Sequence, residues 1–213
     1  MYKKINVHPL IKTKHDDLFE QPVIIRVRRF SESSCETFTD QIDKAVNSGQ
    51  PFIPIVIDSY GGQVYSLLEM IQKMQHCGLP CHTIVEGKAM SCGAILFAMG
   101  NQRYMSPHAT LMLHEVSSNS FGKIEEIKAD AKETDRLNKL LFKLMAENCK
   151  KKYDFFLKLV HNRNHADCYI TATEAKKLNI CTDIGIPTFK IDVSLKFSLE
   201  KFGNKYWFIF NLD

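Results

Sequence analysis

The feature that most constrains the fold is the alternation of short apolar runs with segments of helical periodicity. Residues 23–27, 52–57 and 81–85 are apolar and partly β-branched, which is typical of strands buried on both faces. Between these runs, apolar residues recur at helical spacing over residues 35–46 and 64–74. Strands that alternate with helices predict the α/β class, with mostly parallel strands.

The second half of the chain continues this alternation. Residues 91–99 are apolar on nearly every side, which predicts a buried helix. Strands are expected around residues 103–105 and 110–113. A long helix is predicted over residues 123–149, with a narrow apolar stripe. That stripe fits a partner helix in another subunit and fits packing within the chain equally well.

Capping residues indicate where the helices begin and end. Ser33 or Ser34 is expected to cap the first helix, and Gly78 with Pro80 to stop the second. Further on, the capping box of residues 171–174 predicts the start of a short helix.

The chain of 213 residues is long enough for one domain of ordinary size. Residues 1–22 are polar and aperiodic and are expected to form an extended arm. Residues 23–188 are predicted to be the globular domain, without internal repeats. Residues 189–213 form an extension in which residues 207–210 are expected to be a strand that packs on the body or on a neighbouring subunit.

Composition and charge argue against several classes of function. No apolar run approaches the ~20 residues of a membrane helix, and the N-terminal segment lacks the pattern of a secretory signal. The net charge is +4 with scattered basic residues, so we expect no nucleic-acid binding. Seven cysteines without a repeated spacing indicate reduced thiols and a cytoplasmic protein. Without a phosphate-binding loop, ATP use by this chain itself is not expected.

Residues 87–93 lie between a predicted strand and the buried helix, and they place Ser91 at the helix N-terminus. Free backbone N–H groups there favour negative charge, as an acyl-transfer transition state requires. Small neighbours at positions 89 and 93 would let a substrate backbone approach closely. A plain serine N-cap explains the same pattern, so this segment alone leaves both interpretations open.

Three further positions could complete a catalytic site. The paired glycines Gly61 and Gly62 follow a buried strand and could turn backbone N–H groups towards an oxyanion, or form an ordinary turn. His114 ends an apolar strand and could be a base or a buried structural histidine. Asp167 lies in a predicted loop and could orient a histidine ring or simply belong to a turn.

Other candidate residues are better explained structurally. His161, His165 and Cys168 do not provide an evident tetrahedral ligand set, so no metal site and no cofactor are expected. Cys77 and Cys81 flank a turn at a spacing that is not that of a redox pair, which favours structural thiols.

The order serine, histidine, aspartate differs from that of chymotrypsin, subtilisin and the α/β-hydrolases. With these residues in place, the sequence resembles the ClpP family of self-compartmentalised serine peptidases over roughly residues 23–185. Four segments carry the resemblance: Ser59-Tyr60-Gly61-Gly62, residues 87–93, Leu111-Met112-Leu113-His114, and residues 167–175.

The resemblance implies a triad of Ser91, His114 and Asp167, with Gly62 and Cys92 donating backbone N–H groups to the oxyanion. It also implies the ClpP/crotonase-type fold of stacked ββα units, with residues 123–149 as a handle helix. The family assembles as heptameric rings, commonly two, that degrade polypeptides delivered by an ATP-driven AAA+ unfoldase.

Several positions depart from the family pattern. Val116 stands where the family commonly has proline, residues 117–121 replace a glycine-rich stretch, and Ala166 replaces a basic residue. A homo-heptamer and a tetradecamer therefore both stay open. Three other functions also stay open: a crotonase-like acyl-CoA hydratase or isomerase, a non-catalytic ring subunit, and a viral maturation protease of the same fold.

Overall fold

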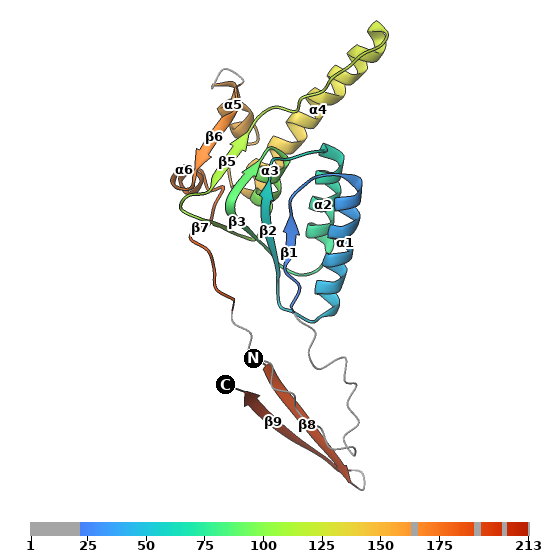
Figure 1. The fold of residues 1–213 in the computed structure, drawn as a ribbon, viewed down its shortest axis with the longest axis vertical. Coiled ribbons are helices and arrows are strands. Elements are labelled where there is room, and N and C mark those ends of the chain that lie inside the picture. Colours follow the sequence, from blue (N-terminus) through green and yellow to red (C-terminus); the bar gives the residue numbers. More distant parts are fainter. Residues whose placement is uncertain (1–21, 163–165, 190–192, 202–203, 213) are drawn as a thin grey trace.

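The computed structural model describes residues 22–162, 166–189, 193–201 and 204–212. Its body is a mixed β-sheet with helices packed around it (Figure 1). The α/β class with mostly parallel strands is therefore confirmed. Except for Pro22, the predicted N-terminal arm lies outside the described residues.

The main path of the sheet follows the order β1-β2-β3-β4-β7, and all of its neighbouring strands are parallel. A branch leaves β3 for β5, which pairs in turn with β6, and β5–β6 is the antiparallel pair of this sheet. The strands are β1 (Ile25–Val27), β2 (Ile53–Ser59), β3 (Cys81–Met90), β4 (Gln102–Met105), β5 (Thr110–Leu113), β6 (Cys168–Thr171) and β7 (Asp183–Ile184).

Strand β3 is longer than the predicted run over residues 81–85, because one of its edges pairs with two strands in succession. Its first half pairs with β4, up to the register Val85↔Met105. Its second half pairs with β5, from Lys88↔Thr110 to Met90↔Met112. Glu86, Gly87 and Lys88 interrupt the apolar pattern, so the periodicity did not predict this second half.

Helices cover the sheet and fill the space beside it. Helices α1 and α2 lie side by side, and the seven residues of α3 are all buried (Figure 1). Burial on every side explains why α3 is apolar all round, as predicted. The helices are α1 (Glu32–Asn47), α2 (Val64–His76), α3 (Cys92–Ala98), α4 (Ile124–Asn148), α5 (Phe155–His161) and α6 (Ala172–Lys177).

The caps differ from the prediction at one helix. Ser31 is the N-cap of α1, so Ser33 and Ser34 were wrong as caps. Ser34 is instead the reciprocal partner, because its hydroxyl accepts the Ser31 N–H at 2.9 Å while Ser31 Oγ accepts the Ser34 N–H at 3.3 Å. At α6 the predicted capping box of Thr171 and Glu174 is confirmed.

Helix α4 has two different halves. In its C-terminal half Leu137, Leu141 and Met145 are buried in the body. Residues 121–132 are all exposed, and Figure 1 shows this end of α4 projecting away from the sheet. Within that stretch Phe121 is 94% exposed and Ile124 is 71% exposed. The predicted apolar stripe is thus buried within the chain over only part of its length.

The C-terminal extension contains β8 (Val193–Lys201) and β9 (Asn204–Leu212), which pair as an antiparallel hairpin. The strand predicted at residues 207–210 lies within β9. Its packing on the body or on a neighbouring subunit stays a prediction. Among the helices that the structure describes, none is both long and apolar enough to span a membrane.

Arg103 of β4 is 5% exposed and joins the end of α3 to the segment after α6. Its guanidinium donates to the carbonyl oxygens of Gly100, Asn179 and Ile180 at 2.9, 3.1 and 2.8 Å. Buried carbonyl groups at chain turns need such donors, since an unpaired buried polar group costs about 1–3 kcal/mol. One side chain thus contacts three turn carbonyls, of which that of Gly100 also accepts from Asn148 Nδ2 at 3.3 Å.

We expect Arg103→Met to lower the free energy of unfolding by about 3 kcal/mol, because the carbonyls of Asn179 and Ile180 lose the guanidinium donor while the apolar stem is kept. The measurement is the urea unfolding midpoint of wild type and variant. Arg136→Met is the control, because Arg136 is 57% exposed and pairs with Glu133 on the surface. That change should cost less than about 1 kcal/mol. Equal effects of the two substitutions would contradict this role of Arg103.

Candidate active site

The β3–β5 pairing brings Ser91 and His114 together. The parallel register ends at Met90↔Met112. It is extended by one hydrogen bond, in which the Ser91 N–H donates to the Met112 carbonyl at 2.8 Å. His114 follows β5 directly, so two residues 23 positions apart in the chain become neighbours at the ends of adjacent strands.

Ser91 stands at a sharp turn from strand to helix. Its backbone has φ 55° and ψ −122°, a region that residues with a Cβ rarely adopt. Its carbonyl accepts the N–H groups of Ala94 and Ile95 at 3.0 and 3.3 Å, and so starts α3. Strain of this kind is held by the surrounding structure and is found at functional sites, including serine nucleophile turns.

The Ser91 hydroxyl and the His114 ring are hydrogen-bonded, with 2.8 Å between Oγ and Nε2. On the other side of the ring, Nδ1 lies 2.5 Å from the main-chain carbonyl oxygen of Glu115. A carbonyl can only accept, so Nδ1 must carry the proton. A neutral ring then has a lone pair on Nε2, which can accept the Ser91 proton.

The two glycines after β2 allow the chain to pass close to Ser91. Gly61 has φ +111°, and a Cβ there would lie 2.8 Å from the Cβ of Ser91. Gly62 has φ +149°, and a Cβ there would lie 2.4 Å from the carbonyl oxygen of Phe30. Both the backbone conformation and the available space therefore require glycine at these positions.

Cys92 links this glycine turn to the serine turn. Its thiol donates to the Gly62 carbonyl at 3.3 Å, and burial raises the pKa of the thiol above its ordinary value. The thiol is therefore neutral near pH 7 and engaged with the backbone, which favours Ser91 over its neighbour as a nucleophile. As the first residue of α3, Cys92 has an N–H without an acceptor inside the helix.

These residues surround a small cavity of about 60 Å³. The cavity brings together the glycine turn, the serine turn and the end of β5, and α4 closes one side. Its lining residues are Gly62, Val64, Ser91, Cys92, Ile95, Leu113, His114, Val116, Ser117 and Leu141.

Asp167 directly precedes β6, on a strand end beside His114. The antiparallel register ends at Leu113↔Cys168, and one further step would set His114 opposite Asp167. The residue is exposed, and no hydrogen bond between its carboxylate and His114 occurs in the described part of the chain. Its orienting role stays a prediction.

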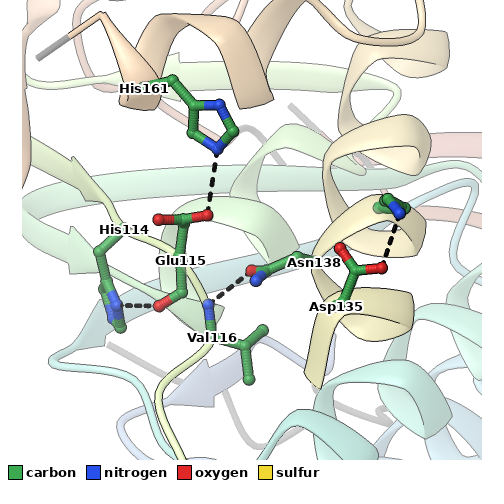
Figure 2. A network of polar contacts seen from close by, with 7 residues as sticks. His114, Glu115, Val116, Asp135, Asn138 and His161 are labelled. Carbon is green, nitrogen blue, oxygen red and sulfur yellow. Dashed lines mark hydrogen bonds and ion pairs between the residues drawn. The ribbon is translucent and has the colours of Figure 1, made fainter. Parts of the chain in front are cut away.

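Two contacts near His114 were not predicted from the sequence (Figure 2). Asn138 of α4 accepts the Val116 N–H through Oδ1 at 2.6 Å. The carboxylate of Glu115 lies 3.1 Å from Nε2 of His161 on α5. No sequence pattern marks these contacts, because they depend on how α4 and α5 pack beside β5.

The other candidates make contacts that the sequence analysis did not consider. Cys77 and Cys81 approach to 3.8 Å between their sulfur atoms, and burial is the main reason why the pKa of Cys81 is raised. Of the residues considered as zinc ligands, His165 lies outside the described residues, and His161 pairs with Glu115.

Residues 11–186 match the Clp protease family. The chain belongs to that family. It is 30% identical over 134 residues to an ATP-dependent Clp protease proteolytic subunit of Bacteroides thetaiotaomicron, covering 62% of this chain and 59% of that protein. It is 38% identical over 87 residues to an ATP-dependent Clp protease proteolytic subunit 1 of Nocardia farcinica, covering 40% of this chain and 44% of that protein. The matches thus span about half the length of these relatives.

Family membership agrees with the resemblance that the four segments carried, and the α/β fold with its parallel sheet is that expected for the Clp protease family. The segments that hold Ser91, His114 and Asp167 all lie within the matched range.

We expect Gly62→Ala to destabilise the fold more than Gly78→Ala does. Both glycines have positive φ, but a Cβ at Gly78 would meet nothing within 4 Å. Gly78→Ala is therefore the control, and backbone strain alone should lower its free energy of unfolding by about 1–2 kcal/mol. At Gly62 the collision with Phe30 adds about 1–3 kcal/mol. Urea unfolding of both variants measures the difference. Equal losses of unfolding free energy would show that Phe30 moves aside without a measurable penalty.

Proposed function

We propose that this chain is a serine endopeptidase that cleaves peptide bonds through an acyl-enzyme. The observation that carries the proposal is the 2.8 Å contact between Ser91 Oγ and His114 Nε2, in a chain of the Clp protease family. Ser91 would be the nucleophile and His114 the base. The proton that Glu115 holds on Nδ1 supports this assignment, because it leaves Nε2 free to take the serine proton.

In the proposed reaction, Ser91 Oγ attacks the carbonyl carbon of the scissile bond while its proton passes to Nε2 of His114. The tetrahedral intermediate expels the amine, which receives that proton from the imidazolium. A water molecule then attacks the ester, with His114 again as base, and the acid product leaves as Ser91 is restored.

Backbone N–H groups of Gly62 and Cys92 are proposed to bind the oxyanion. Both residues line the cavity that Ser91 and His114 share. Cys92 is the first residue of α3, where a backbone N–H has no acceptor within the helix, so this N–H can be donated to a substrate. Loss of one such donor costs about 2.7–4 kcal/mol of transition-state stabilisation in a well-studied serine protease.

We expect Ser91→Ala to keep the fold and to lower the rate of peptide cleavage by on the order of 10⁴-fold or more. The measurements are hydrolysis of a fluorogenic peptide, and covalent labelling of Ser91 by a fluorophosphonate followed by mass spectrometry. Ser33→Ala, at an exposed serine of α1, is the matched control and should leave both signals unchanged.

Full cleavage by the Ser91→Ala variant would refute the nucleophile assignment. Specific binding of coenzyme A without any labelling of Ser91 would instead favour an acyl-CoA hydratase or isomerase. A stable oligomer with neither property would favour a non-catalytic ring subunit.

The chain is further proposed to be a ring subunit that receives polypeptides from an ATP-driven unfoldase. The relatives are named proteolytic subunits of an ATP-dependent protease, which supports a separate ATP-using partner. The projecting half of α4 supports self-assembly, because Ile124 and Ile127 are 71% and 42% exposed, and Phe121 just before the helix is 94% exposed. Exposed apolar side chains at helical spacing indicate a surface that another subunit covers.

We expect Ile124→Glu to lower the mass of the assembly, since a charge would have to be buried at the subunit contact. Lys132→Gln is the control, because it changes the net charge by the same amount at another exposed position of α4. Native mass spectrometry or light scattering gives the masses. Seven or fourteen copies are expected for the control and for wild type, and an unchanged mass of Ile124→Glu would place the contact elsewhere.

A further inference from the structure

The Glu115–Val116 peptide lies between the His114 ring and α4, and it is bonded on both sides (Figure 2). We propose that Asn138 is a positioning residue that holds this peptide, so that the Glu115 carbonyl orients the His114 imidazole. The inference rests on the proposed function of Ser91 and His114. It adds a main-chain carbonyl and a helix residue to the groups that orient His114, and the role of Asp167 stays a separate prediction.

The two hydrogen bonds belong to one peptide unit, that between Glu115 and Val116. The carbonyl of residue 115 and the N–H of residue 116 belong to the same rigid plane and point in opposite directions. The carbonyl accepts from His114 Nδ1 at 2.5 Å, and the N–H donates to Asn138 Oδ1 at 2.6 Å. Any rotation of the plane that breaks the Asn138 bond also turns the carbonyl away from the ring.

Asn138 can act as an anchor because its own position is fixed. It lies on α4 next to Leu137, and Leu141 is the next buried residue on that helix. Leu141 also lines the cavity that contains Ser91 and His114. The amide therefore projects from a helix that is packed against the body, and not from a loop.

The side chain of Glu115 adds a weaker anchor. Its carboxylate reaches Nε2 of His161 on α5, which is held by buried Phe156 and Val160. The side chains of His161 and Glu115 are 40% and 30% exposed, and such pairs contribute about 0–1 kcal/mol. The main-chain bond to Asn138 acts on the same peptide plane as the carbonyl, so it is the contact that the test removes.

A carbonyl can set the tautomer of a histidine as a carboxylate does, since both only accept. In the structure Nδ1 has this partner, and Asp167 is exposed. The direct consequence is that removal of the Asn138 acceptor misaligns the base even when Asp167 is intact.

The test measures the rate of Ser91 labelling by a fluorophosphonate as a function of reagent concentration, on the full chain. Asn138→Leu removes the acceptor at similar volume, and Asn138→Ala removes it without adding an apolar group. We expect both to lower the limiting labelling rate by about 10–100-fold. The reagent concentration at half-maximal rate should not change, because binding of the reagent is untouched.

Two controls separate positioning from a general structural effect. Asn138→Asp keeps an oxygen that accepts the Val116 N–H and should retain a rate within a few-fold of wild type. Asp135→Asn, about one turn earlier on α4, alters a carboxylate that pairs with Lys139 at 2.6 Å on the surface, and it should not change the rate. Thermal melting of each variant shows whether the fold is kept.

Wild-type rates in both Asn138→Leu and Asn138→Ala would overturn the inference, as would faster labelling in either. A rate in Asn138→Asp as low as in Asn138→Leu would also overturn it. An Asp167→Asn variant that abolishes labelling, with Asn138→Ala unaffected, would return the role to Asp167. If wild type is not labelled at Ser91 at all, the proposed function fails first and the inference falls with it.

Discussion

The parallel pairing of β3 with β5 is the interaction on which the whole candidate site depends. The register of this pair places Ser91 next to His114. The hydrogen bond from the Ser91 N–H to the Met112 carbonyl extends the pairing into the turn. Side chains alternate between the faces of a strand, so a slip by one residue would send His114 to the opposite face. The 2.8 Å contact between hydroxyl and imidazole is therefore a property of strand register before it is a property of either side chain.

The strained turn at Ser91 is tolerated because its surroundings leave no alternative. All seven residues of α3 are buried, so the helix cannot shift to relax the φ of 55°. Gly61 packs within reach of the Ser91 side chain, and Cys92 ties the turn to Gly62. Strain at Ser91 is thus balanced by packing and by short contacts that only glycine permits.

The sequence was sufficient for features that depend on neighbouring residues and insufficient for features that depend on packing. Apolar runs and capping patterns located most strands and helices, and the resemblance selected Ser91 and His114. Ser31 was missed because three nearby serines can each serve as a cap, and only the backbone decides among them. Asn138 was missed because a polar residue on a largely charged helix is normally solvated, and its contact with Val116 joins residues 22 positions apart.

Helix α4 contains both the exposed half that we propose for contact with another subunit and Asn138, which we infer to position His114. Ile124 and Asn138 are 14 residues apart on one continuous helix, or about 21 Å along its axis. Only the C-terminal part of that helix is packed against the body. A partner that covers the exposed half would therefore contact the same continuous helix that holds Asn138 against the body. One helix thus carries both the surface that we propose for assembly and the residue that we infer to position His114, because its two halves are exposed and buried in turn.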